Sequence, residues 1–352
     1  MIGRTAGISL LLLLSSQAAW SGEATPGSPV ADSGKTPAIL TIYHAGSLSV
    51  PFANLAKAFQ SLHPGVEVRR QAHGSALAIR QATELGKQAD LVGSSDYLLI
   101  DRMMLESKPQ WASWNLLFAR NSICIVIGPK ARKITSTDWA GALLRPGVRV
   151  GLSNGNLDPC GYRTLMTLYL AQETLGKKDL FNRLILDNSN ITVDRATSGA
   201  LISIPSAVHF KDKLVLRPKE TDLLALLESS VIDYLFIYTS VAAQHHLPFL
   251  ELPPEINLGD PAQEHSYANV AVRTNADTDR AETIQGSAIV YGITIPANSP
   301  RPDLAKAFVD FMQSEKGRAI LRDAGQEPLP PGTYSEASRP PRAARQQGEP
   351  SS

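Results

Sequence analysis

Short apolar runs alternate with helical patterns along most of this 352-residue chain. Residues 38–43 (AILTIY) form the first run, and Pro51 follows at a position that suits the first turn of a helix. Helical spacing then predicts one apolar face made of Phe52, Leu55, Ala56, Phe59 and Leu62. Further strands are predicted at 66–70, 90–92, 123–127, 148–151, 231–238, 249–252 and 287–295. Further helices are predicted at 76–85, 97–105, 164–175, 221–229, 303–312 and 315–323. Strands that alternate with crossover helices predict an α/β fold with a parallel sheet.

Both ends of the chain are predicted to lie outside the fold. Residues 1–21 combine Arg4, an apolar run (AGISLLLLL) and small residues near Ala18, which is typical of a cleaved secretory signal peptide. The run is short for a membrane span, so an uncleaved anchor is the weaker alternative. Residues 22–37 are predicted to be a flexible leader and 333–352 a disordered tail, because both are rich in small, polar or proline residues. We therefore expect a periplasmic protein.

The composition is that of an ordinary globular protein, with 43% hydrophobic and 19% charged residues. The length suits about two domains. A formal net charge of +1 argues against a nucleic-acid partner. Export permits a disulfide between Cys124 and Cys160, but Cys124 lies in an apolar run, which favours a buried free thiol over the disulfide.

Six short stretches carry the chemistry: residues 44–49, 72–76, 94–97, 158–163, 218–222 and 236–240. The first five place small residues, hydroxyls or carboxylates where a helical pattern begins. A helix start offers unpaired N–H groups and the positive end of the helix dipole. Ser47 and Ser75 would donate to an anion there, and Gly46 and Gly74 would let the backbone approach it. Such a pocket needs no lysine or arginine.

The residues alone also allow structural roles. Ser47 and Ser75 are equally suited to capping a helix or a turn, and Ser94 and Ser95 are expected to cap the helix that begins near Tyr97. His44, His73, His245 and His246 match no zinc-binding spacing, so no cation site is expected, although His73 could line a cleft.

Two carboxylates would oppose the binding of an anion in such a pocket. Spacing alone favours Asp158 as an N-cap before Pro159 or as a partner of Arg163. It favours Glu220 as a first-turn residue of a helix capped by Thr221. A carboxylate beside a dianion in a dry cleft would repel it.

The order of the motifs resembles that of the molybdate/tungstate-binding proteins of ABC transporters, in particular the archaeal-type branch. The motifs are YHAGSLSVPFANLAKAF from residue 43, HGSALAIRQATELGKQADLVGSSDYLLIDRMM from residue 73, DPCGYR at 158–163, RPKETDLLALL at 217–227, DYLFIYTSVA at 233–242, ELPPEINL at 251–258 and IVYGITIP at 289–296. The resemblance implies a type II periplasmic binding protein, with two α/β lobes and a ligand cleft between them. It places 38–121 plus 283–332 in the first lobe and 122–282 in the second.

The resemblance also implies the ligand set. Ser47, Ser75, Gly46, Gly74 and Tyr238 would surround molybdate or tungstate as hydrogen-bond donors or close backbone. Family members bring an aspartate and a glutamate to the metal centre at positions matching Asp158 and Glu220. These two residues would expand the four-coordinate metal toward six-coordination and would repel sulfate. Thr239 departs from the family, in which a basic residue is expected after the tyrosine.

The implied protein is a monomeric receptor, not an enzyme, that delivers its oxyanion to a membrane permease without any cofactor. The alternatives are a receptor for sulfate or phosphate, a sensor that docks to a signalling partner, and a secreted serine hydrolase. The hydrolase is the weakest of these, because Ser47 lacks the G-x-S-x-G motif.

Overall fold

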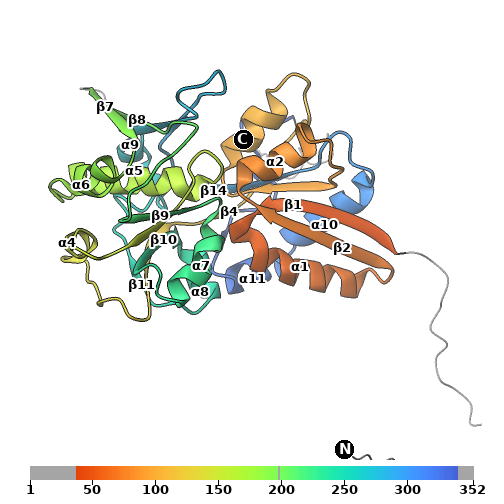
Figure 1. Cartoon of the computed structure of the whole chain (residues 1–352). Helices are drawn as coiled ribbons and strands as arrows, with labels where there is room; N and C mark the ends of the chain where they lie inside the picture. Colours follow the sequence, from red (N-terminus) through yellow and green to blue (C-terminus); the bar gives the residue numbers. More distant parts are fainter. Residues whose placement is uncertain (1–36, 197–198, 340–352) are drawn as a thin grey trace, which may run out of the picture. The chain divides into compact units, whose positions relative to one another are not determined.

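The computed structural model of the protein describes residues 37–196 and 199–339. The predicted signal peptide (1–21) and the leader up to residue 36 lie outside these residues, as does the predicted tail from residue 340 onward. The described chain forms three β-sheets with helices packed on them (Figure 1).

The six-stranded sheet has the order β15-β4-β14-β3-β1-β2. Its strands are β1 (Ala38–Ala45), β2 (Val66–His73), β3 (Leu91–Ser94), β4 (Leu116–Arg120), β14 (Val290–Thr294) and β15 (Glu327–Pro328). β1 pairs in parallel with β2 and β3, whereas β14 is antiparallel to β3 and β4. The crossovers from β1 to β2 and from β2 back past β1 to β3 run in opposite directions. Because both are right-handed, α1 and α2 lie on opposite faces of this sheet (Figure 1).

The five-stranded sheet has the order β11-β5-β10-β6-β9, and the four-stranded sheet has the order β13-β12-β8-β7. The first contains β5 (Ile123–Ile127), β6 (Val150–Ser153), β9 (Leu214–Arg217), β10 (Tyr234–Tyr238) and β11 (Phe249–Glu251). The second contains β7 (Thr192–Ala196), β8 (Gly199–Ser203), β12 (Val270–Thr274) and β13 (Glu282–Gln285). The chain leaves the six-stranded sheet after β4 and returns to it at β14, so two crossings connect it with the other sheets.

Most helices are short. The α-helices are α1 (Ser49–Leu62), α2 (Ser75–Thr83), α3 (Tyr97–Ile100), α4 (Trp139–Leu143), α5 (Pro159–Thr174), α6 (Leu180–Leu184), α7 (Leu224–Glu228), α8 (Thr239–Gln244), α9 (Glu264–Tyr267), α10 (Pro302–Gln313) and α11 (Glu315–Asp323). The 3₁₀ segments are η1 (Gly46–Leu48), η3 (Leu186–Asn188), η4 (Glu220–Leu223) and η5 (Pro261–Gln263), and η2 (Asp101–Leu105) is a π-helical turn. Of the described residues, none belongs to a helix with the length and apolarity needed to cross a bilayer.

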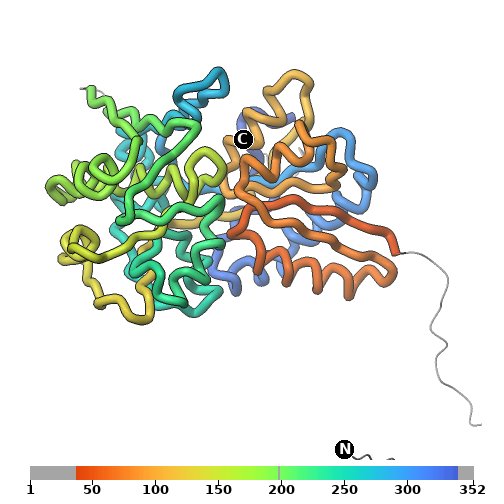
Figure 2. Tube along the Cα trace, viewed as in Figure 1, coloured from red at the N-terminus to blue at the C-terminus, as the bar shows by residue number. Residues whose placement is uncertain are grey.

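The apolar face predicted for α1 is confirmed for four of its five residues. Phe52, Leu55, Ala56 and Phe59 are buried, but Leu62, in the last turn, is 54% exposed. Phe308 of α10 packs edge-on against Phe59 at a centroid distance of 5.2 Å. The C-terminal helices therefore lie beside α1, as the blue and red tubes of Figure 2 show, and close the core of the six-stranded sheet.

The disordered tail predicted for residues 333–352 begins too early in that prediction. Tyr334 forms a bridge with Leu116, and the Ser335 hydroxyl donates to Asp101 Oδ1 at 2.7 Å. Because these contacts tie residues 333–339 to the six-stranded sheet, that part of the predicted disordered segment belongs to the fold.

Candidate functional site

The predicted site residues follow strands of two different sheets. Ser47 lies in η1 after β1, and Ser75 begins α2 after β2, both beside the six-stranded sheet. Asp158 precedes α5, Glu220 begins η4, and Tyr238 ends β10, all beside the five-stranded sheet. All five side chains are buried, with at most 2% of their surface exposed.

The two glycines mark where segments from the two sheets touch. A methyl group at Gly46 would lie 3.2 Å from each carboxyl oxygen of Glu220. A methyl group at Gly74 would lie 2.3 Å from the backbone oxygen of Leu157, which no real side chain could tolerate. Gly74 therefore needs glycine for space, whereas a methyl group at Gly46 would make a tight contact with side chains that could shift slightly. At both positions the close approach is made by the opposite protein segment.

The two carboxyl groups form a buried pair. Asp158 is the N-cap of α5 and accepts from the Cys160 N–H at 3.2 Å, as spacing alone suggests. Its second oxygen accepts from the Glu220 N–H at 2.8 Å. Among the described residues, neither Glu220 carboxyl oxygen has a hydrogen-bond partner. Burial and the charge of Asp158 raise the pKa of Glu220 well above its ordinary value, and burial also raises the pKa of Asp158. The two backbone N–H bonds that Asp158 accepts act to lower its pKa against the effect of burial.

The prediction that Thr221 caps the helix containing Glu220 is wrong. The segment begins one residue earlier than predicted, with Lys219 in the N-cap position and Thr221 inside the 3₁₀ turn. The side chain of Lys219 makes no capping bond, and its ammonium lies 3.2 Å from Asp222.

The hydroxyl groups differ in their surroundings. Ser47 Oγ is buried and has no partner among the described residues. Ser75 Oγ lies 3.1 Å from Ser95 Oγ and accepts from the Ser95 N–H at 3.0 Å. The Tyr238 hydroxyl donates to the same Ser95 Oγ at 3.3 Å. Ser95 is therefore part of this hydroxyl cluster, and the cap of α3 is Asp96, which accepts from the Leu98 N–H. The prediction that the serines cap this helix is wrong.

A buried arginine stands behind the hydroxyl cluster. Arg163 was expected as a partner of Asp158, but its guanidinium lies 3.5 Å from Asp96 Oδ1 instead. It also donates to the Ser95 carbonyl at 2.6 Å and to the Tyr238 hydroxyl at 2.9 Å. Sequence reasoning missed this role, because the partners lie 68 and 75 positions away and on elements of both sheets.

Comparison with known proteins identifies the family of the chain. A family model described as "Bacterial extracellular solute-binding protein" matches residues 40–327. The chain belongs to this family. It is 40% identical over 311 residues to the molybdate/tungstate-binding protein WtpA of Pyrococcus abyssi, covering 85% of this chain and 87% of the relative. It is 39% identical over 301 residues to an uncharacterized solute-binding protein of Methanococcus maripaludis, covering 84% of both chains.

Solved structures establish the fold of this solute-binding protein. The periplasmic molybdate-binding protein of Azotobacter vinelandii superposes with a TM-score of 0.57 at 16% identity, covering 83% of this chain and 99% of that one. The sulfate-binding protein SubI of Mycobacterium tuberculosis superposes with a TM-score of 0.55 at 17% identity, covering 84% and 88%. The predicted α/β fold of a type II periplasmic binding protein is confirmed. Because one fold serves both named anions, the choice of ligand depends on the site.

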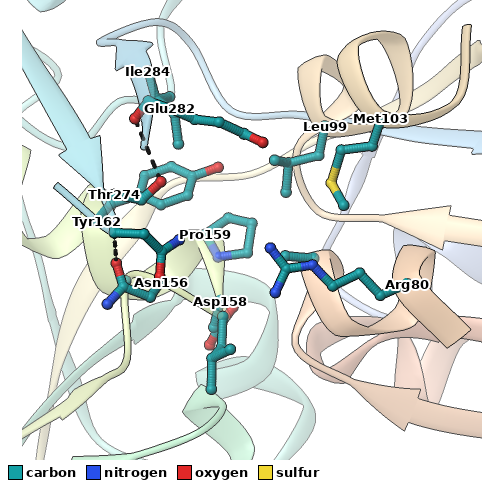
Figure 3. A pocket seen from close by; sticks show the side chains of 14 residues that line it. Arg80, Leu99, Met103, Asn156, Asp158, Pro159, Tyr162, Thr274, Glu282 and Ile284 are labelled. Atoms are coloured by element: carbon teal, nitrogen blue, oxygen red, sulfur yellow. Dashed lines mark hydrogen bonds between the residues drawn. The ribbon is translucent and has the colours of Figure 1, made fainter. Parts of the chain in front are cut away.

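The segments that carry the predicted site residues pack directly against each other. Beside Asp158 lies a cavity of about 20 Å³, which holds little more than one water molecule. Arg80, Leu99 and Met103 line one side of it and Pro159 the other (Figure 3). Of the predicted ligand residues, Asp158 alone lines this cavity, which is smaller than a tetrahedral oxyanion. An oxyanion at the predicted site would require the segments to separate and close again around it.

The remaining candidates are the histidines, the two cysteines and Thr239. His44 is buried beside the Ala45 carbonyl, and desolvation lowers its pKa to about 4. In the part of the chain that the structure describes, no group of three or more His, Cys, Asp or Glu residues could hold a metal ion. Cys124 and Cys160 are both free and buried. Thr239 bonds to Ser122 and lines a separate groove of about 280 Å³.

Proposed function

We propose that this solute-binding protein captures molybdate or tungstate outside the cytoplasm and delivers it to the permease of an ABC transporter. The observation that carries the proposal is that Ser47 and Glu220 lie on adjoining turns and both lack hydrogen-bond partners. Both side chains are fully buried, both lack a partner among the described residues, and they come from adjoining turns beside different sheets. Buried polar groups without partners are costly, and a ligand is one way of satisfying them.

The chemistry of the cluster favours a group-6 oxyanion. Ser47, Ser75 and Tyr238 carry hydroxyl donors, and Gly46 and Gly74 would leave the adjoining backbone uncovered once the opposite segments move away. Asp158 and Glu220 would only repel sulfate, whose sulfur accepts no further oxygen ligands. A large, electron-poor metal centre can accept both carboxylates and become six-coordinate. The relative from Pyrococcus abyssi, named for molybdate and tungstate, supports the same ligand.

Two lobes would close on this ligand. We assign the six-stranded sheet, formed from residues 38–120 and 290–328, to the first lobe. The five- and four-stranded sheets would form the second. Because β13 (Glu282–Gln285) pairs with β12, we place the return crossing after residue 285 instead of at 283.

The proposed location, oligomeric state and lack of a cofactor follow from this role. The family name supports an extracytoplasmic location, for which the predicted signal peptide would provide export. We propose a monomer without a cofactor. A hydrolase is disfavoured because a catalytic serine needs an adjoining base, and Ser47 Oγ has no hydrogen-bond partner among the described residues.

The test is calorimetric titration of the mature protein with molybdate, tungstate, sulfate and phosphate. We expect tight binding of molybdate and tungstate and much weaker binding of the other two anions. Tight binding of phosphate or sulfate alone would overturn the proposal.

A further inference from the structure

The candidate site contains neutral donors and two carboxyl groups. A buried cation, the guanidinium of Arg163, donates a hydrogen bond to one of these groups, the Tyr238 hydroxyl. Arg163, in the second turn of α5, is 3% exposed. Its charge is balanced by Asp96, because the two side chains are 3.5 Å apart and both are buried. Burial of this cation opposes its charge, but Tyr238 and Asp96 outweigh that effect and raise the pKa of Arg163.

The guanidinium fixes the direction of the hydrogen bonds that lead to the site. A guanidinium donates and never accepts. Its bond to the Tyr238 oxygen, at 2.9 Å, therefore leaves the phenolic proton to point elsewhere. In the described conformation that proton goes to Ser95 Oγ, at 3.3 Å.

Ser95 also orients the hydroxyl group of Ser75. Arg163 holds the Ser95 carbonyl at 2.6 Å, which fixes the peptide that follows β3. The Ser95 N–H in turn donates to Ser75 Oγ at 3.0 Å. One lone pair of Ser75 is thus occupied by a donor, so its own proton is free to point toward an acceptor.

We propose that Arg163 is a positioning residue, which acts through Tyr238 and Ser95 to make the hydroxyl cluster present protons to the ligand. The inference rests on the proposed function, because a fully ionised oxyanion only accepts hydrogen bonds. A cluster ordered in this way favours molybdate over a protonated anion such as hydrogen phosphate, which must also donate.

The charge pair also requires the two sheets to be together. Asp96 follows β3 of the six-stranded sheet, whereas Arg163 and Tyr162 belong to α5, which packs on the five-stranded sheet. Tyr162 donates to the other oxygen of Asp96. The ordering of the donors is therefore complete only when these segments meet.

The test compares Arg163→Gln with Arg163→Lys by calorimetric titration with molybdate and with phosphate. Glutamine offers an acceptor to the Tyr238 proton, whereas lysine still only donates. We expect Arg163→Gln to weaken molybdate binding about tenfold or more and to narrow the ratio of molybdate to phosphate affinity. Arg163→Lys should keep most of that ratio. In a Tyr238→Phe background the same Gln substitution should have a smaller effect on molybdate affinity, since one of the two groups through which Arg163 acts is gone.

The matched control is Tyr162→Phe, which removes a buried hydrogen bond to Asp96 without touching the Arg163–Tyr238 contact. Its effect on affinity should add to that of Tyr238→Phe. If Arg163→Gln leaves Asp96 unpaired and the protein does not fold, the double variant Asp96→Asn/Arg163→Gln removes both charges. Its molybdate and phosphate affinities can then be compared in place of those of Arg163→Gln.

Equal loss in Arg163→Gln and Arg163→Lys, unchanged by Tyr238→Phe and with an unchanged affinity ratio, would show a purely structural role and overturn the inference. Failure of the wild-type protein to bind molybdate or tungstate would instead overturn the proposed function on which the inference rests.

Discussion

Glu220→Gln should remove the pH dependence that the buried carboxyl pair gives to the ligand-free protein. The unfolded chain has an ordinary glutamate pKa near 4.5, while burial and Asp158 raise the pKa in the folded state well above it. Between those two values the folded state binds the proton and the unfolded state does not. The contribution to stability is therefore full below the unfolded pKa and is lost as the pH rises toward the folded pKa.

The expected size follows from one proton. Each pH unit inside that window removes about 1.4 kcal/mol of unfolding free energy. His44 acts in the opposite direction between about 4 and 6.5, because its folded pKa is lowered. A comparison of wild type with variant cancels this term, since both contain His44.

The assay is thermal unfolding of the ligand-free mature protein at several pH values from about 5 to about 7. The melting temperature of the variant should rise relative to wild type as the pH increases, by about 2–4 °C per kcal/mol. Glu228→Gln, at an exposed glutamate of α7, should leave the wild-type pH dependence unchanged. A difference between Glu220→Gln and wild type that stays constant with pH would refute the reasoning about the buried pair.

Three further predictions concern the ligand and the closed state. Ser47→Ala and Ser75→Ala should each weaken molybdate binding by about 1–3 kcal/mol in calorimetry, because each leaves a ligand oxygen without a donor; unchanged affinity in both would move the site elsewhere. Gly74→Ala should prevent full closure, since its methyl group would lie 2.3 Å from the Leu157 oxygen, whereas Gly141→Ala, with no atom within 4 Å, should not. The ligand-induced change in small-angle X-ray scattering should therefore be reduced only in Gly74→Ala, and equal changes in both variants would contradict the close contact. X-ray absorption of the molybdate complex should show a six-coordinate metal, and a purely tetrahedral signal would remove Asp158 and Glu220 from the ligand set.

The fold was predictable where strands are apolar on both faces. The runs that became β1, β5, β10 and β14 are fully or mostly apolar, because helices or other sheets cover them. The four-stranded sheet was missed for the opposite reason. β7 (TVDRA) and β13 (ETIQ) are short and mostly polar, so their pairing depends on tertiary contacts.

The ends of helices were harder to predict than their existence. The helix expected at 164–175 begins at Pro159, because the Asp158 cap and the proline at its first position start it one turn earlier. The candidate site shows the same limit. Its individual residues could be found from local motifs, but Arg163 could not, because its partners Ser95 and Asp96 come from the opposite sheet.

The hydrogen bond from the Glu220 N–H to Asp158 Oδ2, at 2.8 Å, couples the positions of the two carboxyl groups. The residue that supplies one carboxyl also anchors the other through its backbone. A metal centre held by both would therefore meet a preformed chelate, with little ordering entropy lost when it enters. The same linkage bears on unloading, since a displacement of the single short turn η4 withdraws Glu220 and frees Asp158 at once. A docked permease would need to shift only this turn to convert a tight chelate into two separate, weaker contacts.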